Sequence, residues 1–137
     1  MLFRLGLCLL LALLVACGPG HGLGPSAGAV SFEVISKGEV VELANFVASD
    51  RITVFDFYAD WCAPCKQVDK SLTSLKSTYG DKLQVYKLDL VNWESALAKH
   101  HGINQLPYLI VFDRGEEMLQ GPANRVLPNL VKALNGP

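Results

Sequence analysis

The stretch Trp61-Cys62-Ala63-Pro64-Cys65-Lys66 is the most informative part of the chain, and it follows the apolar run Ile52-Thr-Val-Phe-Asp-Phe-Tyr58. Nearly continuous apolar content is typical of a central strand covered on both faces. The cysteines would then lie at the start of a helix, where free amide donors and the helix dipole stabilise a thiolate. Two intervening residues place the second sulfur one helical turn further on, within disulfide reach of the first. The pattern predicts a redox-active cysteine pair.

A structural disulfide and half of a zinc site are the alternative uses of this pair. Zinc normally requires a second pair of ligands at suitable spacing. The other cysteines, Cys8 and Cys17, lie in the N-terminal leader, so we favour redox chemistry and predict no metal. The adjacent histidines His100 and His101 do not share a helix face, and we expect both to be solvated at a helix end.

The first sixteen residues have the organisation of an export signal. Arg4 is their single charge, and a leucine-rich run follows from Leu5 to Val15. That run is shorter than the ~20 apolar residues that a membrane-spanning helix needs. A charged start, a short apolar core and small residues at its end predict a signal peptide over residues 1–16.

The end of this signal, Leu14-Val15-Ala16-Cys17, resembles the lipobox of bacterial lipoproteins. In that family the signal is removed just before the cysteine, which then carries the lipid. The resemblance implies that Cys17 anchors the mature chain to the bacterial cell envelope, facing the periplasm or the exterior. An ordinary signal peptide with an incidental Cys17 is the alternative.

The remaining sequence predicts a tether followed by one domain. Residues 17–29 are rich in glycine and proline, as in a flexible linker. Residues 30–137 are sufficient for a single domain with its own core. Twelve Lys and Arg residues against 13 Asp and Glu residues give a formal net charge of −1, without a basic patch. Nucleic-acid binding therefore has no electrostatic support.

Apolar periodicity predicts alternating strands and helices over this domain. We expect strands at residues 31–36, 39–43, 52–58, 83–90, 109–112 and 117–120, and helices from the cysteine pair to residue 80, at 94–100 and at 127–134. Residues 44–50 fit either a short helix or a loop. Gly80 is expected to cap the first helix, and Pro128 is compatible with the first turn of the last one. This order predicts an α/β fold with a mixed sheet between helices.

Two stretches carry a resemblance to the thioredoxin superfamily, and the similarity spans about Phe32 to Leu134. Residues Phe57 to Lys66 resemble the family's Phe-Trp-Ala-x-Trp-Cys-x-Pro-Cys-Lys segment, and Gly102 to Tyr108 resemble its Gly-Ile-x-x-Ile/Val-Pro-Thr segment. The resemblance implies the thioredoxin fold and no cofactor. The chain also resembles the C-terminal domain of the transmembrane disulfide reductase and, in its Gly38-Glu-Val-Val-Glu-Leu43 opening, the membrane-tethered thioredoxins of cytochrome c maturation. The subfamily stays open.

The resemblance assigns roles to the reacting groups. It implies that Cys62 is the exposed nucleophile and that Cys65 resolves the mixed disulfide. Asp56 matches a buried aspartate with a raised pKa that removes the Cys65 proton, through water. An aspartate that only tolerates its position by hydrogen bonding is the alternative. Lys87 matches the lysine beside this aspartate, although it equally fits a solvated strand position.

The resemblance also implies a substrate groove. Pro107 matches the family's cis-proline, and Leu106 before it presents backbone groups that pair with a bound substrate chain. Ala63 and Pro64 shape the loop between the cysteines. Trp61 is expected to shield the sulfurs, although plain packing explains it equally well. Tyr108 replaces the family's threonine and leaves the substrate preference open.

These features predict a monomeric, lipid-anchored thiol-disulfide oxidoreductase that reduces disulfide-containing proteins and is itself reduced by a membrane thiol donor. Strong oxidants of this superfamily carry a histidine between their cysteines, whereas here that loop is Ala63-Pro64. The dithiol is therefore expected to be comparatively reducing. A dithiol oxidase or isomerase of the same fold is one alternative. A copper or zinc chaperone is another, although Met118 is the single thioether outside the leader.

Overall fold

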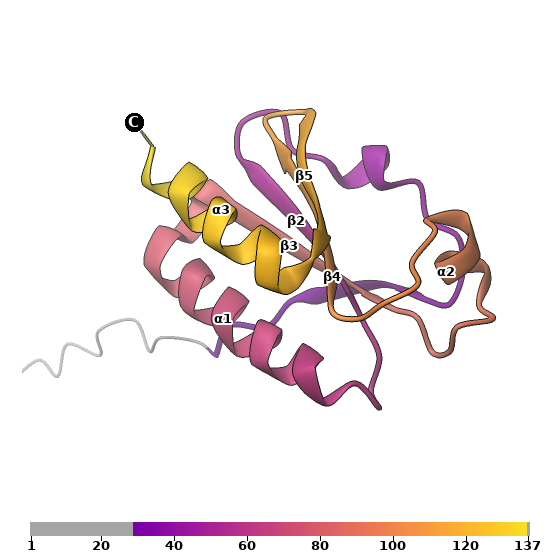
Figure 1. Ribbon diagram of the computed structural model, residues 1–137. Coiled ribbons are helices and arrows are strands. Elements are labelled where there is room, and N and C mark those ends of the chain that lie inside the picture. Colours follow the sequence, from indigo (N-terminus) through magenta and orange to yellow (C-terminus); the bar gives the residue numbers. More distant parts are fainter. Residues whose placement is uncertain (1–28, 137) are drawn as a thin grey trace, which may run out of the picture.

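A five-stranded mixed β-sheet organises the computed structural model, which describes residues 29–136 (Figure 1). Its strands lie in the order β1-β3-β2-β4-β5. They are β1 (Glu33–Lys37), β2 (Ile52–Tyr58), β3 (Leu83–Asp89), β4 (Tyr108–Asp113) and β5 (Glu116–Pro122). Strands β1 and β2 are parallel to β3, whereas β4 is antiparallel to both β2 and β5. The predicted mixed sheet is confirmed.

Helices cover both faces of this sheet (Figure 1). Helices α1 (Ala63–Tyr79) and α3 (Ala123–Asn135) pack on one face, and α2 (Ala96–His100) lies on the other. Helix α1 is the crossover between the parallel strands β2 and β3, and α3 follows the hairpin of β4 and β5. Two 3-10 helices, η1 (Leu43–Phe46) and η2 (Gly80–Lys82), precede β2 and follow α1. The order of strands and helices from β2 onward is the one that the sequence predicts.

Strand β2 lies at the centre of the sheet because its side chains are apolar on both faces. Six of its seven residues are buried, and it pairs with β3 on one side and β4 on the other. Val54 belongs to the core beneath α1 and α3, whereas Phe55 and Phe57 belong to the core on the α2 side. Asp56 is the one charged residue of β2, and by alternation it shares the face of Val54.

Helix α1 is held against the sheet by one apolar side. Val68 and Leu72 are buried in the core that also takes residues from α3. Burial of a leucine such as Leu72 stabilises the fold by about 1.5–3 kcal/mol. Gly80, with φ 54, ends the helix as expected, and its backbone N–H donates to the Lys76 carbonyl. The first turn of α1, which carries the cysteines, is thus fixed in place by the turns behind it.

The predicted strand at residues 39–43 is wrong. After β1 the chain turns at Gly38, which has φ 94, and Ser36 Oγ donates to the Glu39 carbonyl at 2.6 Å. The turn carries the chain away from the edge of the sheet, so residues 39–42 have no strand to pair with. Leu43 is buried at the start of η1, and Val40 is 45% exposed. Residues 44–50 continue as the end of η1 and a loop.

The last helix begins four residues earlier than predicted, at Ala123 instead of Leu127. Pro128 therefore lies inside α3 and not in its first turn. Since proline has no N–H, the Asn124 carbonyl cannot receive the usual helical hydrogen bond from it. Both residues lie on the exposed side of α3, where water can bind this carbonyl.

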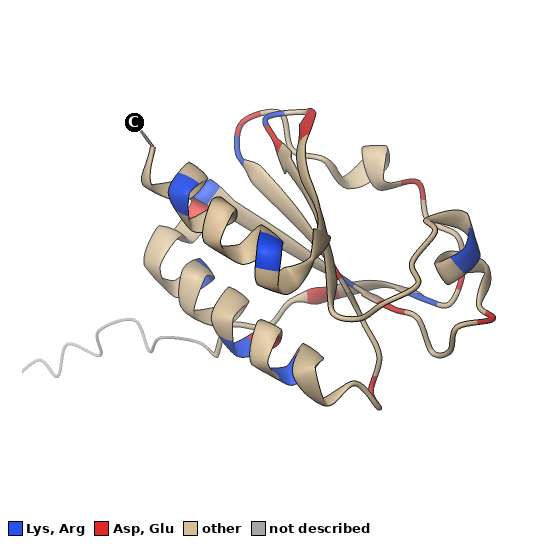
Figure 2. Ribbon diagram, in the orientation of Figure 1, with Lys and Arg blue, Asp and Glu red and all other residues tan. Residues whose placement is uncertain are grey.

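Charged positions of both signs are intermixed over the described helices and loops (Figure 2). Among residues 29–136, no helix is long and apolar enough to cross a membrane. The predicted signal peptide at residues 1–16, the predicted lipidation site Cys17 and the predicted linker up to residue 28 lie outside the described residues.

Candidate active site

Cys62 and Cys65 form a disulfide at the start of α1, with their Cα atoms 5.4 Å apart. Cys62 is the N-cap residue, and its sulfur accepts a hydrogen bond from the Cys65 N–H at 3.3 Å. Pro64 lies at the first helical turn, where its missing N–H costs little. In the reduced state the same amide N–H is placed to stabilise a Cys62 thiolate.

The disulfide is almost covered by its surroundings. Cys62 is 5% exposed and Cys65 is 4% exposed. The two cysteines cluster with Ala59, and Tyr58 and Leu106 pack against them. The expectation of an exposed Cys62 is therefore wrong for the disulfide form, because Tyr58 at the end of β2 and Leu106 from the loop before β4 pack against the pair.

Trp61 is the exposed neighbour of this disulfide, with 54% of its surface accessible. Its Nε1–H donates to the Val91 carbonyl at 2.9 Å, and its ring packs edge-on against Trp93 with centroids 5.4 Å apart. Val91 has φ 62, which is rare for a β-branched residue and marks a constrained connection between β3 and α2. Sequence reasoning missed Trp93 and Val91, because their contact with Trp61 spans about thirty positions of the chain.

The Leu106–Pro107 peptide bond is cis, as the resemblance implies. The Pro107 carbonyl accepts a hydrogen bond from the Ala123 N–H at 3.1 Å, which ties the proline to the start of α3. Leu106 packs against the cysteine cluster from this loop. The two residues therefore lie beside the disulfide although they follow it by about forty positions.

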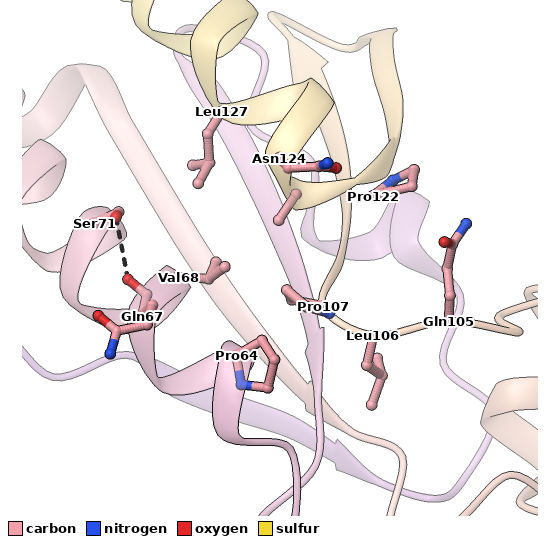
Figure 3. Close-up of a pocket in the computed structure, with 11 residues that line it drawn as sticks. Pro64, Gln67, Val68, Ser71, Gln105, Leu106, Pro107, Pro122, Asn124 and Leu127 are labelled. Atoms are coloured by element: carbon pink, nitrogen blue, oxygen red, sulfur yellow. Dashed lines mark hydrogen bonds between the residues drawn. The ribbon is translucent and has the colours of Figure 1, made fainter.

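A groove of about 430 Å³ lies between the disulfide helix and the cis-proline. Figure 3 shows Pro64 from α1, Leu106 and Pro107 from the loop before β4, and Leu127 from α3 around it. The complete lining is Pro64, Gln67, Val68, Ser71, Gln105, Leu106, Pro107, Pro122, Ala123, Asn124 and Leu127. Of the predicted substrate residues, Pro64, Leu106 and Pro107 line the groove, whereas Trp61 and Ala63 lie outside its lining. Gln67, Ser71 and Asn124, the polar members of α1 and α3, were not singled out by the sequence.

Asp56 lies fully buried beneath α1. Burial raises the pKa of this carboxyl to about 7, against a smaller lowering effect of Lys87, whose Nζ is 3.9 Å from Asp56 Oδ2. The negative charge of Asp69 adds to the rise. Among residues 29–136 neither Asp56 oxygen has a hydrogen-bond partner. The alternative of an aspartate held in place by hydrogen bonds therefore has no support.

A second cavity, of about 290 Å³, reaches Cys65 from the opposite side of α1. It is lined by Tyr58, Ala59, Asp60, Cys65, Lys66, Asp69, Lys70 and Lys87. Lys87 forms an ion pair with Asp69 at 2.5 Å and lies over the Tyr58 ring, 4.3 Å from its centroid. A cavity large enough for several water molecules, with charged side chains in its lining, thus adjoins the sulfur that has to lose a proton.

His100 is exposed as expected, whereas His101 is not. His101 is half-buried, its Nε2 lies 3.1 Å from the Val41 carbonyl, and its ring packs edge-on against Phe57. Burial lowers the pKa of His101, against a raising effect of the Val41 carbonyl. His100 Nε2 lies 3.8 Å from Glu42. Among the described residues no group of three or more His, Cys, Asp or Glu side chains is arranged to hold a metal ion.

Comparison with known proteins agrees with this geometry. The Thioredoxin family model matches residues 34–135. Chloroplastic thioredoxin Y of Oryza sativa subsp. japonica is 30% identical over 126 residues, which cover 88% of this chain and 74% of that protein. The structure of Malassezia sympodialis thioredoxin aligns with a TM-score of 0.57 and 25% identity, covering 76% of this chain and 91% of that one. The structure of oxidised mitochondrial thioredoxin 3 of Saccharomyces cerevisiae aligns with a TM-score of 0.57 and 25% identity, covering 73% of this chain and 94% of that one.

A cysteine pair at the start of a helix, beside a cis-proline on a mixed sheet, defines a protein that exchanges dithiols and disulfides. The match over residues 34–135 shows that the chain belongs to the thioredoxin family. It is a thioredoxin-like thiol-disulfide oxidoreductase, and disulfide-containing proteins are its class of substrate.

Proposed function

We propose that this protein is a protein-disulfide reductase, anchored through Cys17 to a bacterial cell envelope and facing the periplasm or the exterior. One observation supports the direction of electron flow. Among the described residues, the Cys62 sulfur accepts a single hydrogen bond, from the Cys65 N–H, and the pair is almost buried. Burial disfavours a thiolate, and the Ala63-Pro64 loop supplies no polar side chain to stabilise it. The disulfide is then comparatively stable and the dithiol is a good reductant.

The reaction begins with the reduced protein. The Cys62 thiolate attacks one sulfur of a substrate disulfide, the substrate S–S bond breaks, and the other substrate sulfur leaves as a thiolate. Asp56 accepts the Cys65 proton through water, and Cys65 then attacks the Cys62 sulfur. The second substrate sulfur leaves and takes up a proton. The substrate gains two electrons, and Cys62 and Cys65 end as a disulfide.

The groove beside Pro107 supports this role because it can hold an extended substrate segment next to the disulfide. Its walls combine apolar surface from Leu106 and Leu127 with polar side chains from Gln67 and Asn124. The backbone of Leu106 is the expected partner for the substrate main chain. Trp61, exposed beside Cys62, can contact the part of the substrate that does not enter the groove.

The proposed compartment and the proposed electron donor are inferred from the sequence. The lipobox-like end of the leader favours a lipid anchor, and an exported reductase has to be re-reduced because its surroundings are oxidising. A membrane protein with an accessible dithiol is the class of donor that fits. Its thiolate would attack the disulfide of this protein and leave it as a dithiol.

Equilibration of the full chain with a glutathione or dithiothreitol redox buffer tests the proposal. We expect a reduction potential near the roughly −270 mV of thioredoxin, and far below the roughly −120 mV of the strong periplasmic oxidant. A value above about −180 mV, the isomerase level, would replace the reductase with an oxidase or isomerase. Titration of the reduced protein with zinc and copper(I) distinguishes the metal-chaperone alternative, for which stoichiometric tight binding is required.

A further inference from the structure

Lys87 is shared unequally between two carboxyl groups. Its Nζ lies 2.5 Å from Asp69 Oδ1 but 3.9 Å from Asp56 Oδ2, so only the contact with Asp69 is a hydrogen bond. The side chain of Asp69 is 43% exposed, that of Lys87 15%, and that of Asp56 is fully buried. Asp69, the more exposed of the two carboxyl groups, thus holds the lysine toward the solvent side.

The groups around Asp56 leave few other partners for its charge. Strand β3 presents Lys87 directly opposite it in register, and β4 presents Leu109. Helix α1 contributes Asp69 and Cys65, and the buried side chains of α3 are apolar. Tyr58 lies two positions further along β2. Among the described residues, Lys87 is therefore the one cation that forms an ion pair with Asp56, and Asp69 competes for it.

The competition favours the observed position of the lysine. Moving Nζ fully onto Asp56 would desolvate the ammonium group further, which is costly in a protein interior. At its present place Lys87 has the Asp69 hydrogen bond, contact with the Tyr58 ring and some exposure to water. Without the Asp69 charge, Lys87 loses its ion pair at this position. Its Nζ then has to move by only about 1 Å to reach hydrogen-bonding distance of Asp56.

We propose that Asp69 is a positioning residue for the thiol chemistry, because it holds the Lys87 ammonium at the cavity beside Cys65 and keeps it from fixing Asp56 as a permanent carboxylate. This inference rests on the proposed role of Asp56 as proton acceptor. When Cys65 is activated its proton passes to Asp56, and it returns to solvent past Lys87, which lies 3.9 Å from Asp56 and lines the cavity together with Cys65 and Asp69. The lysine at the cavity leaves the buried carboxyl free to change its protonation.

Titration of Asp56 in the disulfide form of the full chain tests the positioning directly. Carbon-13 NMR of the carboxyl group follows its protonation in the wild type and in Asp69→Asn. We expect the Asp56 midpoint to fall by about one pH unit in Asp69→Asn, the lower end of the effect of a nearby opposite charge. Asp60→Asn is the matched control, since Asp60 lines the same cavity and forms no ion pair with Lys87 among the described residues. An unchanged midpoint in Asp69→Asn, or an equal fall in Asp60→Asn, overturns the proposal.

A second comparison separates positioning of the lysine from simple repulsion between the two carboxyls. In a Lys87→Met background, Asp69→Asn should move the Asp56 midpoint much less than it does when Lys87 is present. A fall of the same size without the lysine overturns the positioning role. Asp69→Glu, which keeps the charge, should return the midpoint toward the wild-type value.

The same variants distinguish this inference from the proposed reductase. The titration is measured on the disulfide form and needs no substrate, whereas the reductase is tested by its potential. If the protein has a reduction potential at the oxidase level but the Asp56 midpoint shifts as expected in Asp69→Asn, the reductase proposal is refuted and the positioning role of Asp69 is supported. In the active protein, the pH–rate profile of disulfide reduction should move to lower pH in Asp69→Asn together with the Asp56 midpoint. If the pH–rate profile is unchanged in Asp69→Asn while the Asp56 midpoint falls, Asp69 has no positioning role in the thiol chemistry.

Discussion

Replacing Asp56 by asparagine should make the protein more stable at neutral pH, by an amount that grows with pH. The carboxyl has a pKa of about 7 in the folded protein and an ordinary value of 3.8. A group whose pKa is raised by folding contributes stability that is fully present below the ordinary value and is lost as the pH rises to the folded value. At 1.36 kcal/mol per pH unit, the loss reaches about 4 kcal/mol above pH 7.

The asparagine variant has no such titration, because a neutral amide replaces the carboxyl at nearly the same size. The stability difference between Asp56→Asn and the wild type should therefore widen by about 3 kcal/mol between pH 5 and pH 8. His101 titrates in both proteins, so its contribution cancels from this difference. The amide has to remain buried without a known partner, which lowers the absolute gain but not its change with pH.

Urea unfolding of the disulfide form at several pH values measures this difference. Asp81→Asn serves as the control, because it makes the same chemical change at an exposed carboxyl; an equal change with pH in this variant would contradict the assignment to Asp56. A stability difference that is the same at pH 5 and pH 8 would refute the raised pKa of Asp56 and, with it, the reason for treating this carboxyl as a proton acceptor near neutral pH.

Three further predictions concern other parts of the chain. Cys65→Ser should accumulate mixed disulfides with natural partners because attack occurs without resolution, and Cys62→Ser should accumulate few; equal trapping on non-reducing gels would contradict the assignment of the two sulfurs. Cys17→Ala should abolish lipid labelling and block lipoprotein-type processing, and unchanged membrane extraction would refute the lipobox interpretation. His101→Gln should become more stable relative to the wild type as the pH falls below the ordinary histidine range, since burial lowers the pKa of His101 and its protonation opposes folding; a pH-independent difference in urea midpoints would argue against this.

The local patterns in the sequence were sufficient for the centre of the fold. The apolar run of β2 can only be satisfied by cover on both faces, and a cysteine pair after it predicts the start of α1. The cis bond at Pro107 followed from the family resemblance, because cis proline is a minority state that composition does not reveal. These features depend on residues close together in the chain.

The missed features depend on tertiary context. Residues 39–43 alternate like a strand, but the turn at Gly38 removes them from the edge of the sheet. Pro128 suggested a first turn, whereas its place on the exposed side of α3 allows it within the helix. The ion pair of Lys87 with Asp69 and the closure of Leu106 over the disulfide bring together residues far apart in sequence. No periodicity encodes such contacts.

The pairing of Trp61 with Trp93 gives this protein a built-in optical reporter. The chain has two tryptophans, and both indoles lie together at the rim of the reacting disulfide, 54% and 43% exposed. Its intrinsic tryptophan emission therefore originates entirely from this rim. A substrate segment that covers the indoles transfers them from water to an apolar surface, and the emission wavelength should respond during docking. Encounters with different substrates can then be timed on the unlabelled protein.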